Sequence, residues 1–271
     1  NGVPFGYEFA NEWCCADGMG DRWSCCGHDQ HHSDRSHRGS RRLHHLKPHR
    51  VDKPCQYELM RIVLPSGTPA EIDTSVQQPA MGLVIAPDIF GLRPLFDDLV
   101  ARLAEQWKMA VIAVEPFPGR SLSTDVNERF SAMVSLDDDI HLRDLTEAAD
   151  ALGVDRVGLM GFCMGGMYCF KSARSDRFSK IASFYGMIHV PEGWASSSQG
   201  EPLAYLYVGH PERVLAIIGA QDPYTPPDHV RELFESGVTV CEYPSAVHGF
   251  AHDASRPAHR EHDAQDAFAR T

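Results

Sequence analysis

The sequence lacks the features that would assign it to a membrane or to nucleic acid. No stretch of its 271 residues reaches the roughly 18 uninterrupted apolar residues that a membrane span needs. Basic residues are not in excess, since the formal net charge is −12, and a general nucleic-acid binder needs a basic surface for phosphate. The N-terminus also lacks the basic-then-apolar order of a secretory signal. We therefore expect a protein of the reducing cytoplasm, with no membrane or nucleic-acid partner.

The first 59 residues differ in composition from the rest of the chain. They hold five of the eight cysteines and seven of the fifteen histidines, and their acidic and basic residues balance. All of the net negative charge therefore falls in residues 60–271. The segment HDQHHSDRSHRGSRRLHHLKPHR shows neither a helical nor a strand-like apolar period. We expect residues 1–59 to form a Cys/His-rich, disordered or loosely attached extension.

Two explanations of this extension compete. Its cysteines and histidines suggest zinc, but the doubled pairs Cys14-Cys15 and Cys25-Cys26 fit poorly with the C-x₂₋₄-C spacing of structural zinc sites. We therefore expect no metal, and we favour an upstream or out-of-frame segment that is not native coding sequence, because Met60 stands just before the strand pattern MRIVL. A zinc- or partner-binding protein that works through this segment is the alternative from a different functional class.

Residues 60–271 alternate between buried strand patterns and amphipathic helix patterns. Continuous apolar runs such as MGLVIAPDIFG, MAVIAVEPFPG and RVGLMGF predict strands buried on both faces. Segments such as LFDDLVARLAEQW and DIHLRDLTEAADALGV predict the helices between them. This alternation predicts one α/β domain with a doubly wound, mainly parallel sheet, whose functional residues lie at the carboxyl ends of the strands. The final helix pattern stops abruptly at FART, which suggests truncation.

Cys163 stands in a strand-to-helix turn, within GLMGFCMGG. The small residues Gly161, Gly165 and Gly166 make room for a strained backbone that lifts the side chain above the sheet edge. The N–H of Met164 and the helix N-terminus point at the same space, which favours a thiolate and a developing oxyanion. A nucleophile is the preferred interpretation, and a buried cysteine that acts as a small apolar residue is the alternative.

Two further residues follow later strands. Asp222 comes just after RVLAIIGAQ, and His248 lies in the loop after VTVCEYP. Taken alone, the aspartate is typical of a turn or a helix cap, and the histidine is typical of a solvated loop. The chain order nucleophile, acid, histidine, each beyond a different strand, is however that of the α/β-hydrolase fold. The three residues together therefore predict a Cys163–His248–Asp222 triad.

The motifs GFCMGG, GAQDPYTP and HGF, with the upstream turn APDIFG, resemble the dienelactone hydrolase (carboxymethylenebutenolidase) family from about residue 60 to the end. The resemblance implies that Cys163, Asp222 and His248 form the triad. It also implies that the backbone N–H groups of Met164 and Ile89 form the oxyanion hole.

Two departures from the family pattern concern ionisation of the thiol and binding of the substrate carboxylate. Where the family has a glutamate that helps control ionisation of the thiol, this chain has Asp88, one methylene shorter. Of the two arginines that bind the substrate carboxylate, one corresponds to Arg120, and the other position holds His252. Arg256 lies near it but is not an aligned match.

The sequence as a whole predicts a hydrolase that cleaves an enol-lactone or carboxylic ester through a cysteinyl acyl-enzyme. The expected substrate is a small molecule, and no metal or organic cofactor is required. A broader carboxylesterase or thioesterase on the same scaffold is the alternative within the enzyme class. We expect a monomer or a small homo-oligomer.

Overall fold

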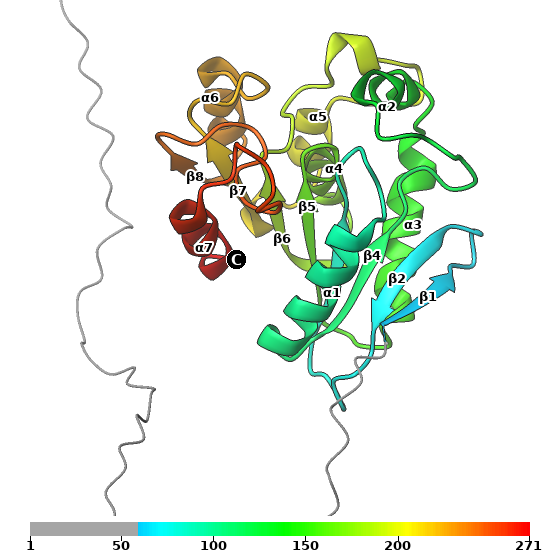
Figure 1. Cartoon of the computed structure of the whole chain (residues 1–271). Coiled ribbons are helices and arrows are strands. Elements are labelled where there is room, and N and C mark those ends of the chain that lie inside the picture. Colours follow the sequence, from blue (N-terminus) through cyan, green and yellow to red (C-terminus); the bar gives the residue numbers. More distant parts are fainter. Residues whose placement is uncertain (1–58) are drawn as a thin grey trace, which may run out of the picture. The chain divides into compact units, whose positions relative to one another are not determined.

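The computed structural model describes residues 59–271, which form an eight-stranded sheet flanked by helices (Figure 1). The strands are β1 (Leu59–Val63), β2 (Pro69–Asp73), β3 (Gly82–Ala86), β4 (Ala110–Val114), β5 (Val157–Phe162), β6 (Phe178–Phe184), β7 (Val214–Gly219) and β8 (Thr239–Tyr243). The α-helices are α1 (Pro94–Trp107), α2 (Val126–Met133), α3 (Asp138–Ala151), α4 (Met164–Ser172), α5 (Pro202–Tyr207), α6 (Pro227–Glu235) and α7 (Glu261–Ala269). Two short 3₁₀ turns, η1 (Glu192–Trp194) and η2 (Pro211–Arg213), complete the described part.

The strand order is β1-β2-β4-β3-β5-β6-β7-β8. Strands β3 to β8 pair in parallel, whereas β1 pairs antiparallel with β2, and β2 pairs antiparallel with β4. The prediction of a mainly parallel α/β sheet is therefore confirmed. The sequence patterns did not predict β2, α2 or α5. The predictions about residues 1–59 concern a segment that lies, except for Leu59, outside the described residues.

Alternate residues of the central strands point to opposite faces of the sheet. Leu83 and Ile85 of β3 pack against α1 and α7, whereas Val84 and Ala86 face the side covered by α3 and α4. Because both faces are covered, β3 and β4 are buried along their whole length. Each large apolar side chain buried in this way stabilises the fold by about 1.5–3 kcal/mol. The carboxyl ends of the parallel strands remain open to the loops that form the site.

A buried ion pair joins α4 to its surroundings. Lys171 of α4 is fully buried, and its Nζ lies 2.8 and 3.0 Å from the two carboxylate oxygens of Asp138, the first residue of α3. Asp138 also accepts hydrogen bonds from the Gly200 N–H at 2.8 Å and from the Tyr205 hydroxyl at 2.9 Å. A buried charge needs such partners to offset its desolvation. The network therefore anchors the helix that follows Cys163 to two other parts of the chain.

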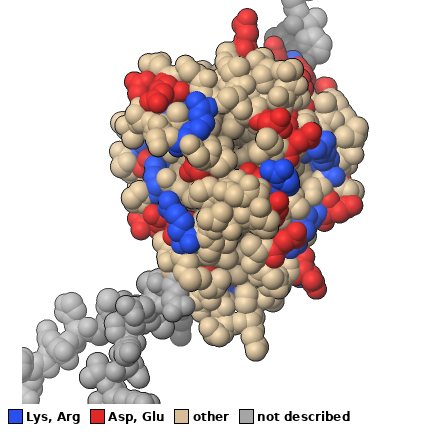
Figure 2. All heavy atoms as spheres, turned by 90° about the vertical axis from the view of Figure 1, so that its right-hand side faces the viewer, with Lys and Arg blue, Asp and Glu red and all other residues tan. Residues whose placement is uncertain are grey.

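The surface of the domain bears charges of both signs. On the face shown in Figure 2, basic side chains lie interspersed with acidic ones. Arg61 contacts Glu71 at 2.7 Å, and Arg143 lies 3.7 Å from Glu147. Glu71 is buried, whereas a solvent-accessible pair such as Arg143–Glu147 contributes about 0–1 kcal/mol. None of the helices in the described part is both long and apolar enough to cross a membrane.

Three glycines allow the turn around Cys163 to form. A Cβ on Gly165 would lie 2.0 Å from the carbonyl oxygen of Ala86, at the end of β3. A Cβ on Gly161 would lie 2.2 Å from the carbonyl oxygen of Gly165, and one on Gly166 would lie 2.7 Å from the Cα of Gly186. Backbone atoms cannot yield as flexible side chains do. Glycine at these positions therefore lets α4 approach β3 and the segment after β6.

We expect Gly165→Ala to destabilise the fold because its Cβ would overlap the β3 backbone. The free energy of unfolding in urea should fall by about 1–3 kcal/mol. Gly193→Ala is the matched control, since a Cβ there would meet no atom within 4 Å. It should change the same quantity by less than about 0.5 kcal/mol. Equal stability of the two variants would contradict the close approach of α4 to β3.

Candidate active site

Cys163 occupies the turn between β5 and α4 with an unusual backbone conformation. Its φ is +57° and its ψ is −117°, outside the regions that non-glycine residues ordinarily adopt. Strain of this kind costs of order 1–3 kcal/mol and persists only where the surroundings enforce it. The Cys163 N–H donates to the carbonyl oxygen of Phe184 at the end of β6, at 3.0 Å. The side chain is partly exposed, at the carboxyl edge of the sheet.

His248 and Asp222, two residues of the predicted triad, lie in contact with each other. The Nδ1 atom of His248, in the loop after β8, lies 2.7 Å from Oδ2 of Asp222, in the loop after β7. Asp222 is buried, and its other oxygen accepts a hydrogen bond from the Tyr224 N–H at 2.8 Å. The imidazole also contacts the rings of Tyr224 and Tyr185 edge-on, with centroid distances of 4.8 and 5.3 Å. These contacts fix its orientation.

The electrostatic surroundings of His248 favour its protonated form. Burial opposes the charge, but a thiolate at Cys163 and the Asp222 carboxylate together raise the pKa of His248 to about 10. The Cys163 and His248 side chains line the same cavity. The arrangement can therefore hold a proton on an imidazole that shares a cavity with Cys163, as a general acid for a cysteine nucleophile must.

Two backbone N–H groups are available beside the cysteine. Met164 is the first residue of α4, and Ile89 follows Asp88 in the turn after β3. Within residues 59–271, neither N–H donates to a protein acceptor. The close contact of Gly165 with Ala86 and Pro87 brings the start of α4 next to this turn. The first residue of α4 therefore lies beside the turn that carries Ile89.

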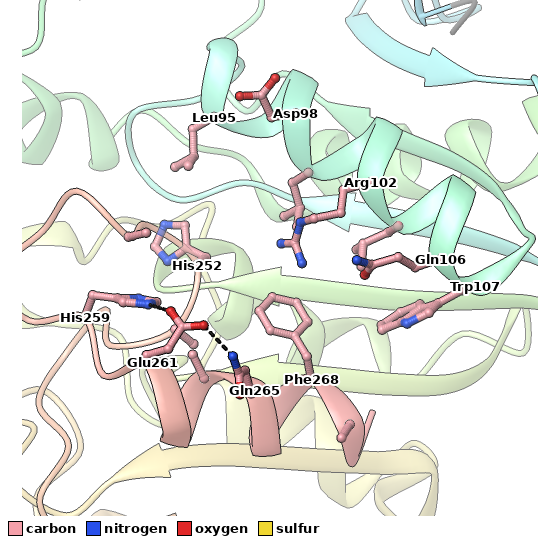
Figure 3. Close-up of a pocket in the computed structure, with 16 residues that line it drawn as sticks. Leu95, Asp98, Arg102, Gln106, Trp107, His252, His259, Glu261, Gln265 and Phe268 are labelled. Atoms are coloured by element: carbon pink, nitrogen blue, oxygen red, sulfur yellow. Dashed lines mark hydrogen bonds and ion pairs between the residues drawn. The ribbon is translucent and has the colours of Figure 1, made fainter. Parts of the chain in front are cut away.

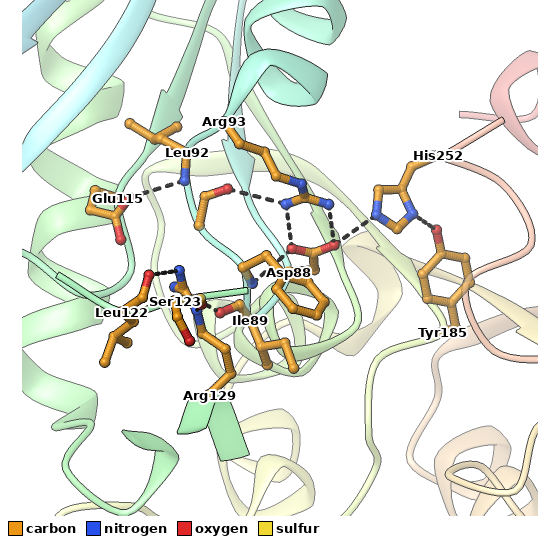
Figure 4. A network of polar contacts seen from close by, with 12 residues as sticks. Asp88, Ile89, Leu92, Arg93, Glu115, Leu122, Ser123, Arg129, Tyr185 and His252 are labelled. Carbon is orange, nitrogen blue, oxygen red and sulfur yellow. Dashed lines mark hydrogen bonds and ion pairs between the residues drawn. The ribbon is translucent and has the colours of Figure 1, made fainter. Parts of the chain in front are cut away.

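Asp88 and His252 belong to a buried polar network (Figure 4). The Asp88 carboxylate accepts hydrogen bonds from both Arg93 Nη atoms, at 2.7 and 2.8 Å, from the Phe90 N–H at 3.0 Å, and from His252 Nε2 at 2.9 Å. Burial by itself would raise the pKa of Asp88, but the bonds from His252 and Arg93 outweigh it and hold the pKa below its usual range. Sequence reasoning missed Arg93, although it stands only five residues after Asp88.

These residues surround a cavity of about 360 Å³. Cys163 and His248 line it, together with Asp88, Ile89 and His252. Apolar and aromatic side chains form much of the remaining lining, namely Phe90, Val126, Phe130, Tyr185, Met187, Trp194 and Tyr224. A pocket of this size with few polar groups is typical of a small-molecule site.

The two arginines near the site differ in position. Arg120 is exposed, does not line the cavity, and donates through Nη1 to the Ser135 hydroxyl. Arg256 does line the cavity, and its Nη1 lies 3.0 Å from where a Cβ on Gly249 would be. Within residues 59–271, no carboxylate forms an ion pair with Arg256. The loop after His248 has no periodic pattern from which this position could be predicted.

A second cavity, of about 600 Å³, lies between α1 and α7 (Figure 3). Arg102, Trp107 and Phe268 line it, and it shares His252 with the first cavity. None of the triad residues faces this space. Among residues 59–271, no group of three or more His, Cys, Asp or Glu side chains is arranged to hold a metal ion. The smaller cavity is therefore the candidate active site.

Comparison with known proteins shows what the chain is similar to. Carboxymethylenebutenolidase 2 of Cupriavidus pinatubonensis is 27% identical over 183 residues, which cover 65% of this chain and 75% of that protein. The carboxymethylenebutenolidase of Pseudomonas putida is 26% identical over 204 residues, covering 69% and 81%. The crystal structure of a Klebsiella pneumoniae protein described as a dienelactone hydrolase shares the fold, with a TM-score of 0.71, 24% identity, and coverage of 79% of this chain and 96% of that one. The model of the dienelactone hydrolase family matches residues 69–271, and the chain therefore belongs to the dienelactone hydrolase family.

Proposed function

We propose that this protein hydrolyses an enol-lactone or carboxylic ester through a cysteinyl acyl-enzyme. The observation that carries the proposal is the placement of Cys163, on a strained turn, in one cavity with a histidine paired to a buried aspartate. Membership of the dienelactone hydrolase family supports the same reaction class. Relatives named carboxymethylenebutenolidase support a lactone as the substrate.

Acylation begins with attack by the Cys163 thiolate on the carbonyl carbon of the substrate. The negative charge moves to the carbonyl oxygen, which accepts hydrogen bonds from the N–H groups of Ile89 and Met164. Such a donor contributes about 3–4 kcal/mol to the stability of the transition state. When the tetrahedral intermediate collapses, the carbon–oxygen bond breaks, and His248 gives its proton to the departing alkoxide or enolate. In a lactone, this step opens the ring.

Deacylation uses the same residues in reverse. The neutral His248 takes a proton from water, and the hydroxide attacks the thioester carbonyl. The new oxyanion accepts hydrogen bonds from the same two N–H groups, and collapse of the tetrahedral intermediate expels the Cys163 thiolate. His248 keeps the proton taken from water, so the charged pair is restored, and the acid product releases its own proton to solvent. Asp222 holds the imidazole in the orientation that both steps need.

A broader carboxylesterase or thioesterase is the second candidate function. The cavity lining favours it in one respect, because Phe90, Phe130, Met187 and Trp194 suit an apolar acyl or aryl group without a charge. Arg256 favours the opposite conclusion, since a guanidinium without a carboxylate partner can bind a substrate carboxylate through two parallel hydrogen bonds. The charge of the preferred substrate therefore separates the two candidates.

Cys163→Ala should lower kcat/KM for an aryl ester by at least about 1,000-fold, because it removes the attacking atom. Cys169→Ala is the matched control. Its sulfur is buried and contacts only the carbonyl oxygen of Ala182 among its polar neighbours, at 3.4 Å. That variant should lose about 1 kcal/mol of stability and keep its turnover. Normal activity in Cys163→Ala would refute the nucleophile assignment.

The charge state of His248 gives a prediction that does not depend on turnover. Because the thiolate and the carboxylate favour the protonated ring, wild-type His248 should stay protonated up to about pH 10. In Cys163→Ala the thiolate is gone and burial opposes the charge, so the pKa should fall. Titration of the imidazole by NMR in both proteins measures the difference. An unchanged pKa in Cys163→Ala would show that the sulfur does not interact with this histidine.

The substrate-charge assignment is tested with the two arginines. Arg256→Gln should raise KM for a carboxylate-bearing lactone by about 10-fold or more and leave KM for a neutral aryl ester nearly unchanged. Arg120→Gln tests the role that the family resemblance gives to that position, and its distance from the cavity lining predicts a smaller effect. Equal effects of Arg256→Gln on charged and neutral substrates would favour the broader esterase.

A further inference from the structure

His252 contacts a neighbour of each catalytic group. Its Nε2 atom lies 2.9 Å from the carboxylate of Asp88, the residue before Ile89. Its ring stacks on Phe162, the residue before Cys163, with centroids 4.8 Å apart and planes at 24°. Its Nδ1 atom forms a hydrogen bond with the hydroxyl of Tyr185, whose ring packs edge-on against His248.

These contacts leave His252 no nitrogen with which to bind a substrate. Both ring nitrogens have protein partners, and only 6% of the residue is exposed although it borders the cavity. A neutral imidazole satisfies both neighbours at once, with Nε2–H donating to the carboxylate and Nδ1 accepting from the tyrosine hydroxyl. Burial raises the pKa of Tyr185 well above its ordinary value, so this hydroxyl keeps its proton and remains a donor.

The bond to Asp88 acts on the turn that presents the Ile89 N–H. The Asp88 carboxylate also accepts from the N–H of Phe90, on the far side of Ile89, so its position fixes the backbone on both sides. Two further anchors hold the turn, since Glu115 accepts from the Leu92 N–H at 3.0 Å and Arg129 donates to the Ile89 carbonyl oxygen at 3.3 Å. Figure 4 shows these anchors on one side and His252 with Tyr185 on the other.

The contact with Tyr185 acts on the general base. Tyr185 has a φ of +41°, a strained value for a residue with a side chain, and its N–H donates to the carbonyl oxygen of Ile217 at 2.7 Å. Its side chain is fully buried, so the hydroxyl serves the protein and not the substrate. The hydrogen bond to His252 therefore fixes the ring against which His248 packs.

We propose that His252 is a positioning residue that joins the oxyanion turn at Asp88–Ile89 to the Cys163–His248 pair through Phe162 and Tyr185. The proposal rests on the acyl-enzyme function above and assigns this histidine to the geometry of the transition state instead of to the substrate carboxylate. Displacement of one oxyanion donor by about 1 Å is enough to cost about 100-fold in rate.

The two amide variants of His252 separate its two hydrogen bonds. Gln places its NH₂ near the position of Nε2, so it can still donate a hydrogen bond to Asp88. Asn places its amide near the position of Nδ1, so it can accept the hydrogen bond from Tyr185 but cannot reach Asp88. His252→Asn should lower kcat by about 10- to 100-fold with KM changed by less than about twofold. His252→Gln, which keeps the bond to Asp88 and loses the one to Tyr185, should lower kcat by only about 3- to 10-fold. His259→Gln is the control from the same loop, because His259 borders only the second cavity and pairs with Glu261.

A second readout isolates the oxyanion hole. An ester and its thionoester differ only in the atom that accepts hydrogen bonds from the two N–H groups, and sulfur is a weaker acceptor than oxygen. The ratio of their kcat values should therefore shrink in His252→Asn and stay at the wild-type value in His252→Gln and His259→Gln. The alkylation rate of Cys163 by iodoacetamide should match the wild-type rate in His252→Asn and His259→Gln, since both variants keep the thiol, His248 and a partner for the Tyr185 hydroxyl.

Several outcomes would overturn the proposal. A rise in KM alone for charged substrates would make His252 a substrate ligand, and a changed alkylation rate would make the Asp88–His252 pair a regulator of the thiol. Wild-type kcat in His252→Asn, with turnover still abolished by Cys163→Ala, would end this inference and leave the proposed function intact.

If both His252 variants fail to fold, Tyr185→Phe tests the proposal instead, because it keeps the ring and removes only the hydroxyl. It should lower kcat about 3- to 10-fold, and no effect would refute the link.

Discussion

The close approach of α4 to the end of β3 is the constraint on which the site depends. Because Gly165 has no side chain, the start of the helix lies against the carbonyl groups of Ala86 and Pro87. This contact brings the Met164 N–H and the turn that bears Ile89 to the same side of Cys163. Cys163, with its strained backbone, occupies the turn that leads into this helix. A side chain at position 165 would push the start of α4 away from the end of β3 and so move Cys163 relative to the turn that bears Ile89.

Charge in the site is arranged in two separate groups. Cys163, His248 and Asp222 form one, in which the pKa of the imidazole is raised so that the ring holds its proton. Asp88, Arg93 and His252 form the other, in which the aspartate is already neutralised by a bidentate arginine. Because the Asp88 carboxylate is occupied in this way, its charge mainly stabilises the local structure. The neighbouring tyrosine, Tyr185, connects the two groups without adding a charge of its own.

Much of the fold was predictable because its central strands are buried on both faces. Continuous apolar runs such as GLVIA in β3 leave little doubt about their place in the sheet. β2 escaped prediction because PAEID begins with proline and contains two acidic residues, and its antiparallel pairing lies near the sheet edge. α2 escaped because this short helix exposes Val126 and buries Arg129, which obscures its apolar period. The triad could be proposed because the order of residues along the chain fixes their order along the sheet edge. The positions of Arg256 and Tyr185 could not be predicted, because both residues lie in irregular segments whose sequences carry no period.

The central claim is that an acyl group passes through Cys163. It is tested most directly by mixing the protein with an aryl ester that deacylates slowly, quenching with acid within the first turnover, and mapping the modified peptide by mass spectrometry. The account predicts one added acyl group per chain, on Cys163 of the peptide that contains GFCMGG. An acyl group on another residue, or product release in the first turnover with no covalent adduct, would contradict it.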